Sequence, residues 1–318
     1  MANPCSWLVV SACLWVVGCW GNALVGQEMQ RYSFEQPQMG TLFHLEFYAM
    51  SDRLAQLAAQ ECFARLDSLN ATFSDYDPNS ELSKLQYGKQ IVSQDLFVVL
   101  AKAQEVAQKT NGAFDISIGP LSKLWRRAFR QMALPAKQKI QTTQSSVDYR
   151  QIQLFAPNVV YLMKPGIKLD AGGIAKGYAL DEMARILRKH NITAYLLDGG
   201  GDLLIGNTPP HHDGWQVKMP ITLRNGEIVY QDTIAKDCAI ATSGDTYKYL
   251  EWEGKRYSHL IDPRTGFGVS HRRMVSLYAP TAMEADVLAS AFCIIKKENL
   301  ARIKAKFPSA NIHFIEPE

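Results

Sequence analysis

Alternation of apolar and polar positions predicts β-strands along much of this 318-residue chain. The segment MGTLFHLEFYA at residues 39–49 alternates and is rich in aromatic residues, which is typical of a strand. We expect a β-hairpin from residues 215–223 and 227–234, with Asn225 and Gly226 in its turn. Shorter strands are predicted at residues 152–155, 159–163, 274–279 and 311–315, and a pair joined by a glycine turn within 194–207.

Helical spacing of apolar residues predicts the other elements. Residues 52–70 carry leucines at this spacing. Ser93 is expected to cap a helix that ends at Asn111-Gly112, and Thr281 with Glu284 forms a capping box for a helix reaching about residue 296. Shorter helices are predicted after Asn79 or Ser80, after Pro120 and before residue 311, whereas the polar residues 131–149 are expected to form a surface excursion. Because strands and helices do not alternate strictly, the pattern favours an α+β fold.

The segment KLDAGGIAKGYALDEMARIL, residues 168–187, is the strongest local candidate for chemistry. We expect a strand closed by Asp170, a turn at Gly172 and Gly173, and a helix with Lys176 in its first turn. Free N–H groups at a helix start together with a lysine favour phosphate binding. The spacing matches neither GxGxxG nor GxxxxGK[ST], so a turn that uses glycine only for packing stays open as the alternative.

Composition indicates an ordinary globular protein. A fifth of the residues are charged and the formal net charge is only +3. No dense cluster of Lys and Arg suggests a nucleic-acid groove, and WRRAFR at residues 125–130 is interpreted as a solvated helix face. We therefore predict no nucleic-acid partner.

The first 26 residues read as an export leader, followed by a single domain over residues 29–318. The apolar run at residues 7–20, about 14 residues long, is shorter than a membrane span and suits a signal peptide. It ends in Val-Val-Gly-Cys19, which resembles the lipobox of bacterial lipoproteins and predicts cleavage before a lipid-bearing Cys19. No Lys or Arg precedes Arg31, so cleavage near Gly26 without lipid, or a buried N-terminal helix, remain alternatives. The predicted location is the cell envelope, at the periplasmic face of the inner membrane through a lipid anchor, or else soluble in the periplasm or secreted.

Six cysteines are divided equally between the leader and the rest of the chain. Cys62, Cys238 and Cys293 lie in apolar surroundings without CxxC or metal spacing. We interpret them as small core residues and predict no structural disulfide.

Three further sites carry candidate chemistry, each with an ordinary structural alternative. Asp286 and Ser290 lie one helical turn apart, so they share a face and suit a hard cation such as magnesium, although an acid near a helix start also simply complements the helix dipole. His259 is either a proton-transfer group at a pocket rim or a structural histidine. Tyr76 and Phe114 either stack on a flat ring or belong to the core.

Eight segments in chain order together resemble the ApbE-type FAD:protein FMN transferases. They are MGT at residue 39, FSDYDPNSELSKL at 73, NGAFDISIGPL at 111, DAGGIAKGYALD at 170, DGGGD at 198, ATSGDTYKY at 241, SHLIDPRTG at 258 and APTAMEADVLASA at 279. The resemblance covers residues 39 to about 295. It departs from the family pattern at Ser290, where threonine is usual, and at Asp198, where asparagine is frequent.

The resemblance implies a T-fold-like α+β architecture, with mixed or antiparallel sheets packed against helices, and FAD and Mg²⁺ as ligands. It implies transfer of FMN to a threonine or serine hydroxyl of a target protein, with release of AMP. The expected acceptors are subunits of sodium-pumping Nqr-type or Rnf-type redox complexes and small FMN-binding domains. By this resemblance His259 is the base, Gly173, Asp286 and Ser290 hold the metal, and the FAD site is lined by Met39, Tyr76, Ala113, Phe114, Asp115, Asp170, Lys176 and Leu260.

Rival functions remain open at this point. A magnesium-dependent FAD pyrophosphatase would use the same residues with water as the nucleophile. A non-catalytic FAD-binding lipoprotein is disfavoured because storage needs neither metal nor base. A flavin oxidoreductase is disfavoured because the chain has no nicotinamide-binding motif.

Overall fold

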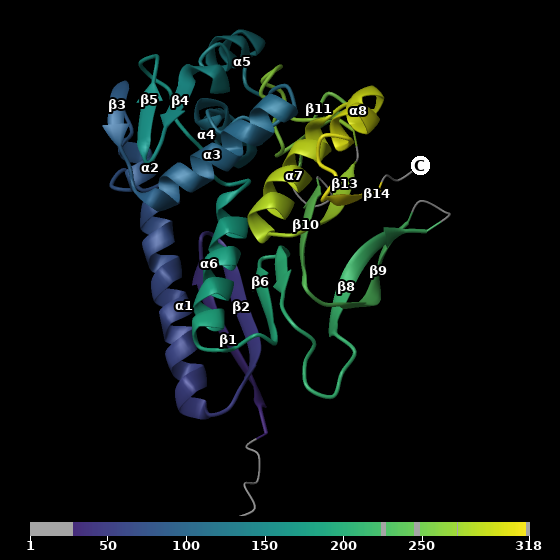
Figure 1. Ribbon diagram of the computed structural model, residues 1–318. Helices are drawn as coiled ribbons and strands as arrows, with labels where there is room; N and C mark the ends of the chain where they lie inside the picture. Colours follow the sequence, from purple (N-terminus) through teal and green to yellow (C-terminus); the bar gives the residue numbers. More distant parts are fainter. Residues whose placement is uncertain (1–27, 224–226, 245–248, 272, 316–318) are drawn as a thin grey trace, which may run out of the picture.

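The largest element of the computed structural model, which describes residues 28–223, 227–244, 249–271 and 273–315, is an antiparallel seven-stranded sheet (Figure 1). Its strand order is β1-β2-β6-β7-β10-β13-β14. The strands are β1 (Gln30–Gln38), β2 (Thr41–Ala49), β6 (Tyr195–Gly199), β7 (Leu203–Ile205), β10 (Cys238–Gly244), β13 (Met274–Ala279) and β14 (Asn311–Ile315).

Strand β2 shows why one face of the sheet packs against the main apolar core. Phe43, Leu45 and Phe47 are fully buried in the main apolar core, and the residues between them point to the opposite face. The predicted strand at 39–49 begins only at Thr41, because Met39 and Gly40 have positive φ angles of 49° and 79° and form the β1–β2 turn. The preceding edge strand β1 was not predicted.

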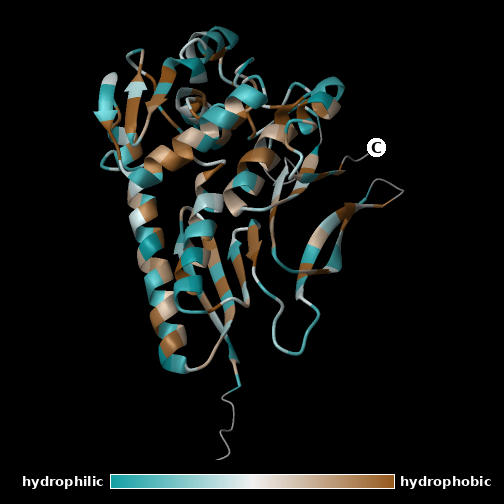
Figure 2. Ribbon diagram, in the orientation of Figure 1, coloured by the Kyte–Doolittle hydropathy of each residue, from teal (hydrophilic) through white to brown (hydrophobic). Residues whose placement is uncertain are grey.

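Three helices cover the face to which Phe43 points: α1 (Asp52–Phe73), α6 (Ala175–Lys189) and α7 (Ala282–Ile294) (Figures 1 and 2). The predicted caps are confirmed for α7, where the Thr281 side chain accepts the Glu284 N–H, and for α3 (Gln94–Lys109), where Ser93 accepts the Leu96 N–H. Helix α7 is buried along most of its length, so groups placed on it are held rigidly.

The other face carries the predicted hairpin, formed by β8 (Trp215–Thr222) and β9 (Ile228–Ala235). Trp215, Val217 and Met219 pack onto the sheet in a second apolar cluster with Ile205 and Ile240. Among the described strands, β8 pairs only with β9, so the hairpin lies on the sheet without joining it. Its turn at residues 224–226 lies outside the described residues.

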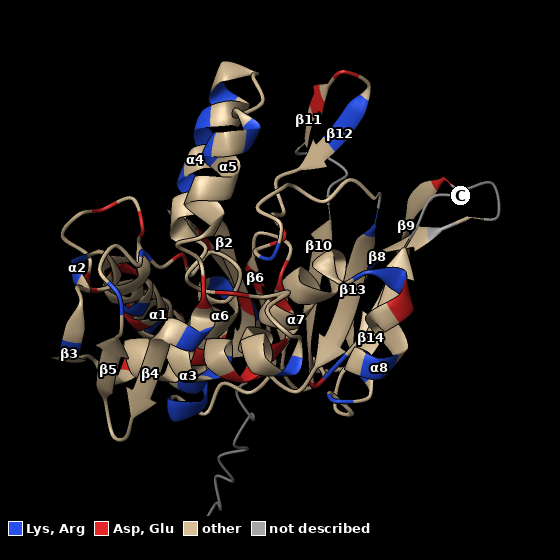
Figure 3. Cartoon of the chain, turned by 90° about the horizontal axis from the view of Figure 1, so that it is seen from above, with Lys and Arg blue, Asp and Glu red and all other residues tan. Residues whose placement is uncertain are grey.

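The remaining elements lie beside and above the helical layer. Among the described residues they are α2 (Glu81–Lys84), β3 (Gly88–Ile91), α4 (Gly119–Gln131), α5 (Lys137–Gln144), a 3₁₀ turn (Tyr149–Gln151), β4 (Ile152–Phe155), β5 (Val159–Leu162), β11 (Tyr249–Trp252), β12 (Lys255–Ser258), a second 3₁₀ turn (Lys297–Asn299) and α8 (Leu300–Lys304). Strands β3, β5 and β4 form a small sheet, and β11 pairs with β12. Lys and Arg are spread over α3, α4, α8 and β12 (Figure 3).

Two irregular segments differ in part from what the sequence predicts. Residues 131–149 lie mostly at the surface, as expected, but they contain helix α5, whose fully buried Ile140 joins Trp125 and Leu121 in a third apolar cluster. The strand expected to close at Asp170 is absent, and a single parallel bridge joins Lys168 to Ile118 instead.

The WRRAFR segment is only partly the solvated helix face that we expected. Trp125 is buried and its indole N–H donates to the Gly266 carbonyl at 2.8 Å. Arg126 is half-buried in ion pairs, whereas Arg127 and Arg130 are exposed. Burial of Trp125 therefore depends on a loop more than a hundred residues away.

Cys62 and Cys293 are buried and Cys238 is half-buried, in keeping with small core residues. In the part of the chain that the structure describes, no helix is both long and apolar enough to cross a membrane. The leader with Cys5, Cys13 and Cys19 lies outside the described residues. The α+β architecture with antiparallel sheets and packed helices is confirmed.

Candidate active site

A cavity of about 400 Å³ opens where the starts of α4 and α6, the helix α7, the end of β10 and the loop after β12 meet. Ten of the twelve predicted site residues in the described chain line it. They are Ala113, Phe114, Asp115, Asp170, Gly173, Lys176, His259, Leu260, Asp286 and Ser290.

The start of α6 places a lysine at this cavity, as predicted. The Gly172 N–H donates to the Asp170 carboxylate at 2.8 Å, which fixes the turn before the helix. Lys176 follows in the first helical turn, with its Nζ 2.5 Å from Asp202 Oδ2 and 3.4 Å from Asp286 Oδ2. The cavity wall thus carries one ammonium group between two buried carboxylates.

Burial and the neighbouring charges shift the pKa values of Asp286 and Lys176. Burial raises the pKa of Asp286 to about 6, although the attraction of Lys176 opposes the increase. Burial by itself would lower the pKa of Lys176, but Asp286 and Asp202 outweigh it and raise that pKa above its usual value. The lysine is therefore fully protonated at neutral pH, and the cluster carries an excess of negative charge that a cation can offset.

Helix α7 contacts α6 at Gly177, and this contact brings Asp286 of α7 close to Lys176 of α6. A Cβ on Gly177 would lie 2.2 Å from the Ala282 carbonyl oxygen, so only glycine allows this approach. The Gly177 N–H donates to Asp286 Oδ2 at 3.1 Å. Asp181, one turn further along α6, accepts the N–H groups of Ala282 and Met283 at 2.9 Å each and so caps the start of α7.

The three predicted metal ligands lie together. Asp286 and Ser290 both line the cavity from α7, and a Cβ on Gly173 would lie 3.1 Å from Ser290 Oγ. A carboxylate, a hydroxyl and a main-chain carbonyl are hard oxygen donors of the kind that Mg²⁺ prefers. Within the described residues no group of three or more His, Cys, Asp or Glu side chains is placed to hold a metal ion. Because Mg²⁺ prefers octahedral coordination, these three donors would leave positions for substrate or water oxygens.

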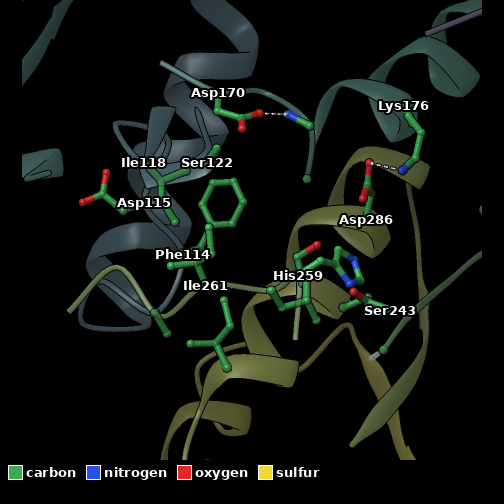
Figure 4. A pocket seen from close by; sticks show the side chains of 18 of the residues that line it. Phe114, Asp115, Ile118, Ser122, Asp170, Lys176, Ser243, His259, Ile261 and Asp286 are labelled. Carbon is green, nitrogen blue, oxygen red and sulfur yellow. Dashed lines mark hydrogen bonds and ion pairs between the residues drawn. The ribbon is translucent and has the colours of Figure 1, made fainter. Parts of the chain in front are cut away.

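The cavity has a polar end and an apolar end (Figure 4). Lys176, Asp286, His259 and Ser243 gather at the polar end, whereas Phe114, Ile118 and Ile261 lie at the other. His259 follows β12 directly and is half-buried. The arrangement suits a ligand that is flat and apolar at one end and anionic at the other.

Two carboxylates at the apolar end also hold the protein together. Asp115 accepts the N–H and Oγ–H of Ser117 and the N–H of Tyr149, and its side chain points away from the cavity in Figure 4. Burial raises its pKa despite these bonds. Asp170 accepts a hydrogen bond from Arg126 Nη2 at 2.8 Å. Both residues therefore fix the loops around the cavity.

The structure does not bring Met39 and Tyr76 to the cavity wall. Met39 lies in the β1–β2 turn, close in sequence to Thr41, whose side chain packs against Gly200 of the cavity wall. Tyr76 is 73% exposed, with its ring 4.4 Å from the Arg126 guanidinium carbon. Contact of either residue with a ligand therefore stays a prediction.

Sequence reasoning missed Asp202, Ser122 and residues 242–244, all of which line the cavity. Asp202 is 6% exposed and is the nearer of the two carboxylates to Lys176. The DGGGD segment pointed to this place but contains two aspartates. Asp198 accepts the Gly201 N–H in the β6–β7 turn, and only the turn geometry shows that Asp202 is the one that faces Lys176.

The chain belongs to the ApbE family, whose model matches residues 39–313. It is similar to an FAD:protein FMN transferase of Treponema pallidum, with 29% identity over 95% of this chain and 88% of that protein. A second FAD:protein FMN transferase, from Haemophilus influenzae, is 28% identical over 88% of this chain and 85% of that protein.

Solved structures of the same family share the fold. The flavin transferase ApbE from Vibrio cholerae superposes with a TM-score of 0.80 at 24% identity, covering 90% of this chain and 93% of that one. The ApbE flavinyl transferase of Pseudomonas stutzeri gives a TM-score of 0.80 at 22% identity, covering 92% of each chain. The architecture implied by the resemblance is therefore confirmed.

Proposed function

We propose that this protein is an FAD:protein FMN transferase, which moves FMN from FAD to a threonine or serine hydroxyl of a target protein and releases AMP. The observation that carries the proposal is the cavity in which Lys176, Asp286 and His259 converge beside an apolar end. Membership of the ApbE family and the names of the similar proteins support it.

The cavity residues match the parts of FAD. Phe114, Ile118 and Ile261 offer an apolar surface to a flat ring. The Lys176 ammonium group in the first turn of α6 favours the pyrophosphate. The ligand would thus lie with its flavin ring toward α4 and its pyrophosphate toward α7.

The residues expected to hold magnesium fit a hard cation. Gly173 through its carbonyl, Asp286 and Ser290 supply oxygen donors on one side of the cavity, and the excess negative charge around Lys176 favours a cation. When bound, Mg²⁺ would neutralise charge on the phosphate oxygens.

The transfer step requires a nucleophile, a base and a leaving group. The acceptor hydroxyl oxygen forms a bond to the phosphorus of the FMN half, and the bond from that phosphorus to the bridging oxygen breaks, so that AMP leaves with the electron pair. His259, at the polar end, accepts the hydroxyl proton. Lys176 stabilises negative charge on the phosphate oxygens.

A single incubation tests this function against the pyrophosphatase alternative. The protein is mixed with FAD, Mg²⁺ and a small FMN-binding acceptor domain, and the acceptor is analysed by mass spectrometry. We expect one FMN per acceptor and an equal amount of AMP, with loss of both products in EDTA and in the His259→Ala variant. Free FMN and AMP with an unmodified acceptor would instead establish a hydrolase.

We also propose that residues 29–318 act as one domain in the cell envelope, tethered by lipid at Cys19, with subunits of Nqr-type or Rnf-type complexes as acceptors. The lipobox-like sequence before Cys19 supports the anchor. Labelling of cells with a radioactive fatty acid tests it. The wild-type chain is expected to incorporate label and the Cys19→Ala variant is not; a soluble, unlabelled wild-type chain would favour cleavage near Gly26.

A further inference from the structure

A groove leads away from the active-site cavity along the face of the large sheet that the helices leave uncovered. A second cavity, of about 530 Å³, shares Gly200, Thr242 and Gly244 with the first. A third, of about 590 Å³, shares Glu46, Leu196 and Gln216 with the second. The three cavities thus follow one another from the active site to the far end of the β8–β9 hairpin.

The floor of this groove is the outer face of strands β2 and β6. His44 pairs with Asp198, and Glu46 pairs with Leu196, in the antiparallel register. These residues alternate with the buried Phe43, Leu45 and Leu197, so their side chains face away from the helices and into the groove. Along β6 the floor leads to Gly200 and so to the active site.

The wall of the groove is strand β8, and among the described residues no strand pairs with the edge of β8 that faces away from β9. The Leu223 N–H donates to the Glu227 carbonyl at 2.8 Å across the hairpin, so the main-chain groups of Leu223 point toward the opposite strand of the hairpin. In an antiparallel ladder the bonding direction alternates, so Gln216, Lys218 and Pro220 direct their main-chain groups away from β9. Pro220 agrees with this assignment, because proline within a strand occupies a position whose nitrogen faces outward.

We propose that this groove binds the acceptor protein as an extended segment that pairs with the open edge of β8 and brings its hydroxyl to His259. The proposal rests on the proposed function, since it concerns the second substrate of that reaction. An extended segment satisfies the outward N–H and C=O groups of Gln216 and Lys218, as in other complexes formed by strand addition. Side chains on one face of the segment lie over Leu196 of the floor and over Leu203 of the neighbouring strand β7.

Two features at the junction favour passage of a main chain into the active site. The two cavities share Gly200, Gly244 and Thr242 there, and none of these three residues has a long side chain that would narrow the passage. The junction also lies on the side of Ser243 and the polar end, opposite the apolar end assigned to the flavin. A hydroxyl arriving along the groove would therefore reach the phosphates without crossing the ring.

Proline substitutions on each edge of the hairpin test which edge binds the acceptor. Lys218→Pro removes an outward N–H on the groove edge and leaves the inward bonds to β9 intact. Asp232 is the residue opposite Lys218, is also exposed, and is not part of the groove wall, so Asp232→Pro makes the matched change on the far edge. Lys218→Ala controls for loss of the side chain alone.

Each variant is assayed for FMN transfer to a small FMN-binding acceptor domain, for FAD affinity, and for acceptor binding without turnover by fluorescence titration in EDTA. For Lys218→Pro we expect the acceptor KM and dissociation constant to rise about tenfold, as for loss of one or two main-chain hydrogen bonds. FAD affinity and thermal unfolding are expected to match those of Asp232→Pro and Lys218→Ala.

Equal acceptor binding by Lys218→Pro and Asp232→Pro, or no measurable binding by the unchanged protein, would overturn the groove assignment. Acceptor binding that is sensitive to Lys218→Pro, without any FMN transfer by the unchanged protein, would support the groove and refute the proposed function. The two failures are thus distinguishable.

Discussion

Replacement of Gly177 by alanine is expected to separate the two helices that form the polar end of the active site. The added Cβ would lie 2.2 Å from the Ala282 carbonyl oxygen and 2.7 Å from the Met283 Cα, and both of these are main-chain atoms. Ordinary contact begins at 3.4 Å, so the start of α7 must retreat by about 1 Å in a close-packed interior. That movement also stretches the bonds from Ala282 and Met283 to Asp181.

The change in the free energy of unfolding caused by Gly177→Ala is the sum of opposing contributions. Alanine in place of glycine favours the helix by about 1 kcal/mol. Overpacking costs about 1–3 kcal/mol, and weakening of hydrogen bonds to a charged acceptor adds about 1.5–3 kcal/mol. The steric and hydrogen-bond losses exceed the helical gain, so we expect Gly177→Ala to lower the free energy of unfolding by about 2–4 kcal/mol.

Urea denaturation followed by circular dichroism measures this change, with FMN transfer measured on the folded variant. We expect transfer to fall at least about tenfold, because Asp286 and Ser290 move with α7 while Lys176 stays on α6. Lys189→Ala, at the exposed end of the same helix, should change stability by less than about 0.5 kcal/mol. A Gly177→Ala protein that is more stable than wild type and fully active would refute the close approach of α6 and α7.

Further predictions concern Asp181 and Arg126. Burial raises the pKa of Asp181 to about 6 in the folded protein, so the stability that it contributes is present below about pH 4 and is lost as the pH rises through 6. Relative to Asp181→Asn, wild type should therefore lose up to roughly 3 kcal/mol between pH 4 and pH 7, measured by urea denaturation; a constant difference would contradict this cause. Arg126 pairs with both Asp75 and Asp170, so Arg126→Ala should lower stability by about 1.5–3 kcal/mol and raise the KM for FAD several-fold, whereas Arg126→Lys should recover part of both. An unchanged KM for FAD in Arg126→Ala would show that the ion pair between Arg126 and Asp170 does not contribute to FAD binding.

The sequence alone identified those elements whose signals are local. The caps at Ser93 and Thr281, the aromatic alternation of β2 and the helix start at Lys176 depend on side chains within a few residues. The structure contains all of these elements, although β2 begins two residues later than predicted. The failures occurred where a distant contact decides. Ile140 turns a polar segment into α5 because it packs against Trp125, and periodicity in eight residues cannot reveal such a partner.

The active site divides in the same way. Motifs in the sequence supplied Lys176, His259, Asp286 and Ser290, and the fold collected them in one cavity. Only the tertiary structure selected Asp202 over Asp198, since both lie in one glycine turn and the turn geometry determines which carboxylate reaches Lys176. The groove beside β8 is likewise absent from the sequence, because it requires strands β2 and β6 to lie next to a hairpin that pairs with neither of them. Local propensity therefore determined the elements and the residue types, and long-range packing decided which of those residues meet.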